Sequence, residues 1–261
     1  MCTFLIEHFK NKLNATLIDS NNMKFKKTLL RISGLTTNEN FRQIWLAKTL
    51  TQLPADLRIL DAGAGELRNQ PLCKHLNYVS QDICEYKGTG DTKGLQTGNW
   101  NTDAIDLVCD ISNIPEPDCS FDIILCSEVF EHLPDPLKAL DEFSRLLKPG
   151  GHLILTAPFS SLVHFAPYHF ATGFSRYWYE HHLPLRGFQI DELTANGDWF
   201  SLLRQELMRL PRVASDYHIT LRPFTYILSG IAFLYFLLPR NRNQSYELAC
   251  FGWHVLASKR H

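Results

Sequence analysis

From Arg58 onward, short apolar runs alternate with stretches of helical or turn character. This alternation predicts an α/β fold, because strands that alternate with helices form a parallel sheet with helices on both faces. Helices are expected at 135–147, which the run from Lys148 to Gly151 would end, and at 176–183. The expected strands are 58–62, 78–83, 106–111, 121–126, 152–156 and 188–193, with a long last strand at 247–259.

Two helical additions to this core are expected. In the first fifty residues, apolar side chains such as Phe41, Ile44 and Trp45 recur at three- and four-residue steps. Residues 1–53 are therefore expected to form an N-terminal helical cap on a domain of residues 54–261. A helical insertion at about 198–245 is expected before the last strand.

Charge and cysteine content exclude several classes of protein. The chain has 26 basic and 27 acidic residues, and this balance argues against a nucleic-acid substrate, which usually goes with a basic excess. Its seven cysteines are odd in number and include no C-x-x-C pair, which argues against a zinc ribbon or a thioredoxin-like motif. Several of them sit in apolar runs, as free thiols do in a reducing compartment, so we expect a cytoplasmic protein.

The first predicted strand runs into a loop that carries Gly63 and Gly65. Glycine permits positive φ and close approach of a ligand to the backbone, at the sheet edge where such folds bind ligands. A dinucleotide fingerprint would need a third glycine where Arg68 stands. Asp61, just before the first glycine, suits instead the ammonium of an amino-acid moiety. Taken alone, the loop is equally consistent with a turn that binds nothing.

Acidic residues also end the next two predicted strands. Asp82 ends the second strand, where its carboxylate can accept hydrogen bonds from both hydroxyls of a ribose. Asp110 ends the third and can accept from an adenine amino group, while the N–H of Ile111 meets a ring nitrogen. Each residue alone is also a common strand-end cap. Together with Asp61 they would line one nucleoside that has a cationic tail.

With these motifs the chain resembles the class I S-adenosylmethionine-dependent methyltransferases, of the methyltransferase type 11-like kind. The resemblance spans about residues 58–160 and implies a Rossmann-like, mostly parallel seven-stranded sheet whose last strand is antiparallel. It implies S-adenosylmethionine as cofactor and S-adenosylhomocysteine as product. It departs from the family at Leu67, where a third glycine is frequent. The motifs are 60–65, 82, 110–111, 121–129, 131–133 and 146–151, and the implied cofactor-binding residues are Asp61, Ala62, Gly63, Gly65, Asp82, Ile83, Asp110, Ile111, Ser127 and Glu128.

Methyl transfer from a sulfonium is an in-line displacement, so the protein mainly aligns the nucleophile and excludes water. A hydroxyl acceptor also needs a base or a Lewis acid. The expected catalytic residues are His132, Tyr168 and His169, with His132 as a metal-free base.

A metal-dependent alternative exists for the same segment. Its E-x-x-E-H pattern is similar to that of metal-assisted O-methyltransferases, which makes Glu128, Glu131 and His132 candidate ligands of a divalent cation. The histidines further along the chain do not follow a known ligand signature, so one or two are expected to face substrate and the others to lie on the surface. They are His164, His169, His181 and His182.

Residues 223–239 contain no charged side chain and are shorter than the ~20 residues of a comfortable membrane span. Because apolar residues occupy every face, we expect a helix buried against the sheet edge or in a homodimer. An interfacial helix in peripheral contact with a membrane and a lid over a lipid-like acceptor are the alternatives.

The sequence therefore predicts a methyltransferase, with O-methylation of a small-molecule, sugar or lipid-linked acceptor as the favoured reaction. The alternative is a non-catalytic S-adenosylmethionine-binding module of the same fold that docks on a membrane or a partner. A nicotinamide-dependent reductase is disfavoured by Arg68 and by the motifs at 131–133 and 148–151.

Overall fold

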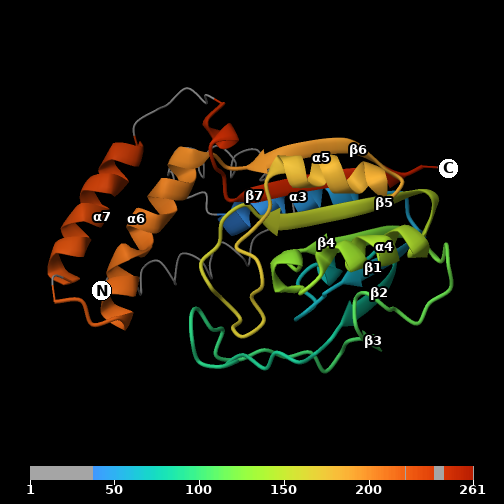
Figure 1. Cartoon of the computed structure of the whole chain (residues 1–261), viewed down its shortest axis with the longest axis horizontal. Coiled ribbons are helices and arrows are strands. Elements are labelled where there is room, and N and C mark those ends of the chain that lie inside the picture. The colour runs from blue at the N-terminus through green and yellow to red at the C-terminus, as the bar shows by residue number, and fades with distance from the viewer. Residues whose placement is uncertain (1–37, 221, 238–243, 261) are drawn as a thin grey trace. The chain divides into compact units, whose positions relative to one another are not determined.

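The computed structural model describes residues 38–220, 222–237 and 244–260 (Figure 1). The described residues fall into two compact units: one holds residues 38–203 and 244–260, and the other holds residues 204–220 and 222–237. The helix α3 (Asn38–Thr51) belongs to the same unit as the sheet. The helical cap expected at 1–53 falls mostly outside the described residues and stays a prediction.

The first unit is built on a seven-stranded sheet with the order β3-β2-β1-β4-β5-β7-β6. The pairs among β1 to β5 are parallel, and β7 pairs antiparallel with both β5 and β6. The predicted sheet with an antiparallel last strand is therefore confirmed. The strands are β1 (Arg58–Ala62), β2 (Asn77–Asp82), β3 (Leu107–Val108), β4 (Phe121–Ser127), β5 (Leu147–Pro158), β6 (Phe188–Asn196) and β7 (Gly252–Lys259).

Several expected boundaries differ from the structure. The third strand, expected at 106–111, spans only Leu107–Val108, so Asp110 follows it rather than ending it. The run from Lys148 to Gly151 follows the end of the helix as expected, but it belongs to β5 and forms a bulge, because Phe121 pairs with Leu147 and Ile123 with His152. A Cβ on Gly151 would lie 2.9 Å from the carbonyl oxygen of Asp122, so glycine lets the two strands approach there. The last strand begins at Gly252 rather than 247, and a 3-10 turn (Gln244–Glu247) precedes it.

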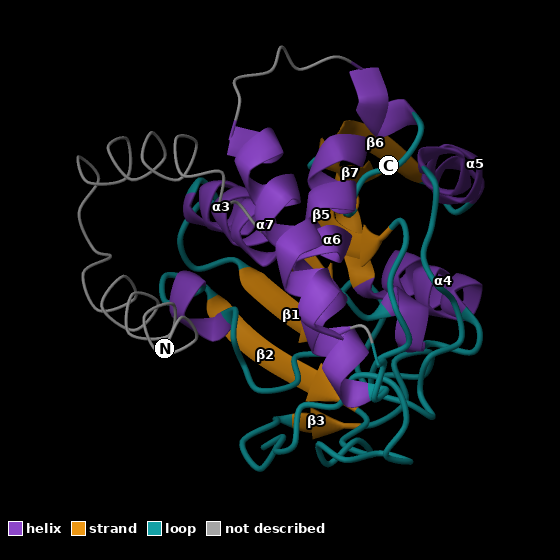
Figure 2. Cartoon of the chain, turned by 90° about the vertical axis from the view of Figure 1, so that its left-hand side faces the viewer, coloured by secondary structure: helices purple, strands orange, loops and turns teal. Residues whose placement is uncertain are grey.

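Alternating side chains of the strands build two separate cores, one on each face of the sheet. On one face Ile59 and Ile123 pack with Trp45, Leu46 and Leu50 of α3. The other face, with Leu60 and Ile124 at its centre, is covered by α4 (Pro136–Leu146) and α5 (Arg176–Leu185). Figure 2 shows α3 and α4 on opposite sides of the sheet. In such layered folds a ligand site can form at the carboxyl ends of the parallel strands.

The second unit contains most of α6 (Trp199–Asp216) and all of α7 (Arg222–Leu237). The Ser229 hydroxyl donates to the carbonyl oxygen of Leu207 at 2.6 Å, which joins the two helices. Within this single chain, small side chains of α7 are buried and its large apolar ones are exposed, so the expected burial against the sheet edge or in a homodimer stays a prediction. Within the described residues, none of the helices is both long and apolar enough to span a bilayer. The buried residues are Thr225, Ser229 and Ala232, and the exposed ones include Phe224, Tyr226, Ile227, Ile231 and Leu234.

Candidate active site

A cavity of about 720 Å³ opens beyond the carboxyl ends of β1, β2 and β4. This is the edge where open α/β sheets bind ligands, and the volume is that of a small-molecule site. α3 and the segment that follows β5 contribute the remaining walls. Eight of the ten predicted cofactor-binding residues line the cavity: Gly63, Gly65, Asp82, Ile83, Asp110, Ile111, Ser127 and Glu128.

Two glycines shape the loop after β1. Gly63 and Gly65 have φ angles of 75° and 53°, in the left-handed region that glycine adopts without strain. A Cβ on Gly63 would lie 2.5 Å from Cγ2 of Val129, and one on Gly65 would lie 2.6 Å from Cζ2 of Trp100. Neither position has room for a side chain. Leu67, where the resembling family often has a third glycine, also adopts a positive φ of 57°, so the turn forms without that glycine.

Asp61 lies beneath this loop rather than in the cavity wall. Its side chain is buried, and Oδ2 accepts a hydrogen bond from the Tyr78 hydroxyl at 2.6 Å. Burial raises the pKa of Asp61 to about 6. Ala62 is also buried outside the cavity lining. The structure thus places Asp61 where it supports the loop, and direct contact of its carboxylate with a ligand ammonium stays a prediction.

Asp61→Asn is expected to remove a pH dependence of stability. Between about pH 4 and pH 6 folded Asp61 keeps its proton while the unfolded residue releases it, so unfolding becomes more favourable as pH rises. The wild-type free energy of unfolding should fall across this window by about 3 kcal/mol more than that of the variant. Urea denaturation of both proteins from pH 4 to 7 measures the difference. If the free energies of unfolding of the two proteins changed with pH in parallel, the raised pKa of Asp61 would not be the cause of the pH dependence.

Asp82 connects the loop after β1 with the end of β2. Its Oδ2 accepts from the N–H of Gly65 at 2.9 Å and its Oδ1 from the N–H of Cys84 at 2.8 Å. A carboxylate offers about four lone-pair sites, so both oxygens can still accept hydroxyl hydrogen bonds from the cavity. Ile83 follows with 49% of its surface exposed and provides an apolar wall beside the carboxylate.

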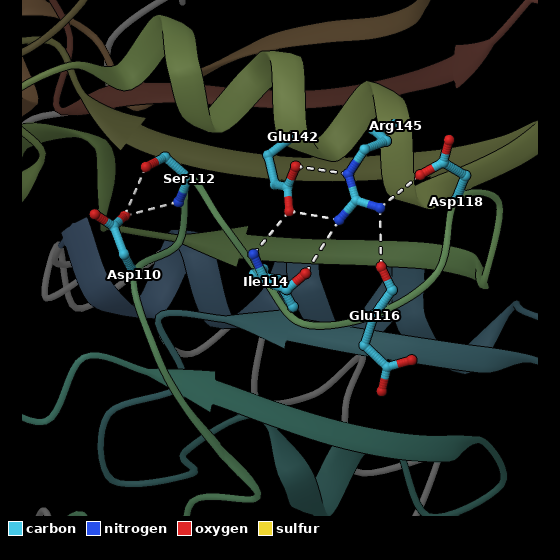
Figure 3. A network of polar contacts seen from close by, with 7 residues as sticks. All are labelled: Asp110, Ser112, Ile114, Glu116, Asp118, Glu142 and Arg145. Carbon is cyan, nitrogen blue, oxygen red and sulfur yellow. Dashed lines mark hydrogen bonds and ion pairs between the residues drawn. The ribbon is translucent and has the colours of Figure 1, made fainter.

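Asp110 begins a segment that α4 holds against the sheet (Figure 3). Its Oδ1 accepts from the N–H and the hydroxyl of Ser112, both at 2.8 Å. Glu142 on α4 accepts from the N–H of Ile114 at 2.7 Å and pairs with Arg145 at 2.7 Å. The network thereby fixes the backbone that carries Asp110 into the cavity wall. Arg145 also donates to the carbonyl oxygens of Ile114 and Glu116 and to the carboxylate of Asp118.

Glu128, after β4, is held by a residue that the sequence did not single out. Arg42 on α3 forms an ion pair with its Oε2 at 2.9 Å, and the Thr156 hydroxyl donates to its Oε1 at 3.0 Å. Glu128 has a φ of 58°, so the chain turns sharply there. Arg42 also lines the cavity. Arg42 reaches Glu128 only because α3 packs beside the end of β4, and no local pattern of the sequence indicates where α3 packs.

His132 lies on the same wall, on the short 3-10 turn Phe130–His132. Its Nδ1 contacts the carbonyl oxygen of Tyr168, which requires the proton on Nδ1 and leaves the lone pair on Nε2. Burial lowers the pKa of His132 to about 4, so the ring is neutral near pH 7. Neighbouring Glu131 is buried, and burial raises the pKa of its carboxyl well above the usual range. A neutral imidazole with a free lone pair can accept a proton.

The segment after β5 brings further histidines to this wall. His164 and Tyr168 line the cavity with His132, whereas His169 lies behind the lining. The His164 ring is 4.6 Å from that of His132 and 4.9 Å from that of His169, measured between centroids. Burial lowers the pKa of His169 and raises that of Tyr168. The three predicted catalytic residues, His132, Tyr168 and His169, are therefore close together. His164, which was not among them, lies beside the two histidines. His181 and His182 lie apart from them on α5.

The predicted metal-ligand set of Glu128, Glu131 and His132 is not the set that the structure brings together. Glu128 is engaged by Arg42, while Glu131 Oε1 lies 3.7 Å from Nε2 of both His132 and His164. The side chains that converge are thus His132, His164 and His169, with the carboxyl group of Glu131 beside the first two.

Aromatic rings form another part of the cavity that was not predicted. The ring of Phe165 stacks on Tyr86 at 4.5 Å and on His132 at 5.1 Å between centroids. Trp100 meets Phe165 edge to face at 5.1 Å. All three aromatic residues line the cavity. They come from loops far apart in sequence, so a pattern-based prediction has no local signal for them.

Part of the sequence matches a known protein family. Residues 60–155 match the model of a family described as "Methyltransferase domain". The match covers less than half of the chain and shows that this segment is similar to the class I S-adenosylmethionine-dependent methyltransferases. The segment contains the glycine loop, the ends of β2, β3 and β4, and α4, so the match covers most of the predicted cofactor-binding wall of the cavity. His164, Tyr168 and His169 lie outside the matched residues.

Individual relatives match over shorter parts of their length. Over 102 residues the chain is 32% identical to a ubiquinone biosynthesis O-methyltransferase of Xylella fastidiosa strain M23, which is 38% of this chain and 41% of that protein. The enzyme of the same name from Leptothrix cholodnii is 25% identical over 43% of this chain and 48% of the relative. The chain thus spans less than half the length of these curated relatives. The solved structure of the cyclase SpnF shares the fold, with a TM-score of 0.51 and 17% identity over 85% of this chain and 81% of SpnF.

Proposed function

We propose that this protein transfers the methyl group of S-adenosylmethionine to a hydroxyl of a small-molecule acceptor. One observation carries the proposal: a single cavity has the carboxylates Asp82 and Asp110 in its wall together with the neutral His132. The carboxylates suit a nucleoside and the imidazole suits a proton that must leave the acceptor. The name of the curated relatives, which specifies an O-methyltransferase, supports an oxygen acceptor.

Each group of residues has a distinct task in this proposal. Asp82 accepts from the ribose, Asp110 and the N–H of Ile111 meet the adenine, and the loop at Gly63 lets the ligand approach the backbone. The bound cofactor supplies a methyl group on a positively charged sulfur. His132 accepts the hydroxyl proton at Nε2, while its Nδ1–H stays on the carbonyl oxygen of Tyr168. The cavity walls align the two reactants and exclude water.

The aromatic part of the wall indicates the kind of acceptor. Tyr86, Trp100 and Phe165 present π faces and edges beside His132. Planar rings pack favourably against such surfaces, in offset or edge-to-face contacts worth about 0.5–1.5 kcal/mol each. We therefore propose an aromatic hydroxyl compound as the acceptor class, ahead of a sugar.

A second function has one observation in its favour. The chain shares its fold with SpnF, which is named as a cyclase, so this architecture also serves chemistry other than methyl transfer. A module that binds S-adenosylmethionine without transferring its methyl group would keep the cofactor wall and show no turnover. Incubation with methyl-labelled cofactor and a panel of phenols separates the two functions.

Calorimetry with S-adenosylmethionine tests the cofactor side. Asp82→Ala is expected to weaken binding at least about tenfold, because two hydroxyl hydrogen bonds and the anchor of Gly65 are lost together. Asp191→Ala, at an exposed position of β6, is the matched control and should bind as the wild type does. Absence of binding by the wild type would remove the proposal altogether.

For α7 we propose peripheral contact with a membrane. The exposed face of this helix carries aliphatic and aromatic side chains, among them Tyr226, Ile227 and Ile231, which are 58–61% exposed. The sequence places an arginine at each side of the apolar run, Arg222 and Arg240, and no acidic residue between them. Such composition suits a helix that lies in the interface of an anionic membrane. The cytoplasmic location stays a prediction.

Sedimentation with anionic vesicles tests this contact. The double variant Ile227→Glu/Ile231→Glu is expected to lose most vesicle binding, because two charges would enter the apolar layer. Leu185→Glu, at a residue 69% exposed on α5, should leave binding unchanged. Vesicle binding equal to that of the wild type would contradict membrane contact through α7. Sedimentation velocity that shows a dimer lost in the variant would assign the face to self-association instead.

A further inference from the structure

Three imidazoles converge at the wall of the cavity. His132, His164 and His169 each offer one ring nitrogen, and these atoms all lie within 4.8 Å of one another. His132 follows β4, whereas the other two come from the segment after β5, so two segments far apart in the sequence meet at this point. Positively charged imidazoles would repel each other at these distances, so the cluster is compatible with neutral rings.

Backbone carbonyls orient two of these rings. Nδ1 of His132 contacts the carbonyl oxygen of Tyr168, and Nδ1 of His164 that of Leu162 at 2.9 Å. Each contact places the proton on Nδ1 and directs the lone pair of Nε2 to the other side of the ring. Metal-binding histidines are held in this way, with the second nitrogen donating to a carbonyl or carboxylate.

A buried carboxylate completes the cluster. Glu131 is 1% exposed, and its Oε1 lies 3.7 Å from Nε2 of His132 and from Nε2 of His164. Its Oε2 and both ring nitrogens of His169 are buried with no hydrogen-bond partner among the described residues. Buried polar atoms without a partner cost free energy, so they indicate a ligand that would satisfy them.

We propose that Glu131, His132, His164 and His169 form a binding site for a divalent transition metal of the zinc class. Three nitrogens and one carboxylate oxygen are a donor set for Zn²⁺ or Co²⁺, whereas Mg²⁺ prefers oxygen donors and water. The set differs from the E-x-x-E-H candidates of the sequence, because His164 and His169 take the place of Glu128. Arg42 already neutralises Glu128 through their ion pair.

The geometry requires only a small contraction. Zinc–nitrogen bonds of about 2.0–2.1 Å in a tetrahedron separate two nitrogens by roughly 3.4 Å. The three imidazole nitrogens, within 4.8 Å of one another, must therefore approach by at most ~1.4 Å, and Glu131 Oε1 already lies 3.7 Å from Nε2 of His132 and of His164. Rotation of His169, whose ring nitrogens have no hydrogen-bond partner among the described residues, can supply most of this movement. His132, Glu131 and His164 line the cavity, so an ion there is within reach of a bound acceptor. With the ion bound, Nε2 of His132 is a ligand and no longer a base, so the ion would promote loss of the acceptor proton in its place. This consequence for the acceptor rests on the proposed function.

Metal titration of the purified protein, without methyl donor or acceptor, tests the site. Cobalt serves as the probe, because its visible absorption reports the number and geometry of its ligands. We expect about one Co²⁺ per chain with four-coordinate bands, displaced by Zn²⁺ and not by Mg²⁺. Zinc should also shift the ring ¹⁵N resonances of the three histidines in the wild type, a readout that depends on no variant.

Variants assign the ligands. His164→Ala and His169→Ala are each expected to weaken Co²⁺ binding at least about tenfold, and His181→Ala on α5 is the control that should not. Circular dichroism verifies that each variant is folded. Unchanged binding in both variants, preference for Mg²⁺, or unshifted histidine resonances in the wild type would each overturn the proposal. Because no methyl transfer is measured, these outcomes are independent of the proposed function.

Discussion

His132→Ala is expected to lower methyl-transfer turnover roughly 10²–10⁴-fold while leaving the affinity for S-adenosylmethionine nearly unchanged. The imidazole is neutral because burial lowers its pKa to about 4, and the carbonyl of Tyr168 fixes its tautomer, so Nε2 is ready to accept a proton. In the proposed function Asp82 and Asp110 hold the cofactor and His132 does not, so binding should survive. Turnover with an acceptor from the phenol panel and calorimetry of the same protein give the two numbers.

Two comparisons show whether the loss of turnover in His132→Ala comes from the loss of a base. His181→Ala, on α5 and outside the cavity lining, should keep wild-type turnover. An acceptor analogue that is already ionised should recover a large part of the turnover of His132→Ala, because it has no proton to lose. Full activity of His132→Ala towards a neutral phenol would rule out the assigned role.

Gly63→Ala is expected to weaken S-adenosylmethionine binding by about 100-fold or more, equivalent to about 2.7 kcal/mol. The added Cβ would lie 2.5 Å from Cγ2 of Val129, so the loop must move away from the position that admits a ligand. A non-glycine residue at φ 75° adds strain of roughly 1–2 kcal/mol, which should also lower the melting temperature.

Gly187→Ala is the matched control for this prediction. Gly187 has a φ of 80°, and a Cβ there would meet nothing within 4 Å. Both variants therefore carry the same kind of backbone strain, and both should lose stability, but only Gly63→Ala should lose ligand affinity. Equal ligand affinities in the two variants would show that the loop at Gly63 does not form the cofactor site.

Much of the sheet could be predicted, because its strands are short apolar runs with clear boundaries. β1 spans the residues expected from sequence, and α4 begins at Pro136 because Asp135 caps it through the N–H groups of Leu137 and Lys138. The run from Lys148 to Gly151 comes directly after α4 ends, as expected, and it also belongs to β5, which was not expected. Whether glycines form a loop or let two strands approach depends on the neighbouring strand, and a single segment does not contain that information.

The cofactor wall was predictable for a related reason. Asp82 and Asp110 follow strands, and the carboxyl ends of parallel strands share one edge, so chain order already places them together. Arg42 and Trp100 were missed because they reach the cavity through the packing of a helix and a long loop. The composition of α7 indicates that its surface needs a cover but does not indicate which side packs within the chain. That side carries the small residues Thr225, Ser229 and Ala232, and the large apolar residues are exposed in the single chain.

The most direct test of the account is a crystal structure with S-adenosylhomocysteine bound. We expect the ribose on Asp82, the adenine beside Asp110 and Ile111, and the sulfur on the side of the cavity that His132 lines. Absence of the ligand from this cavity at saturating concentration, or a sulfur directed away from His132, would contradict the central claim.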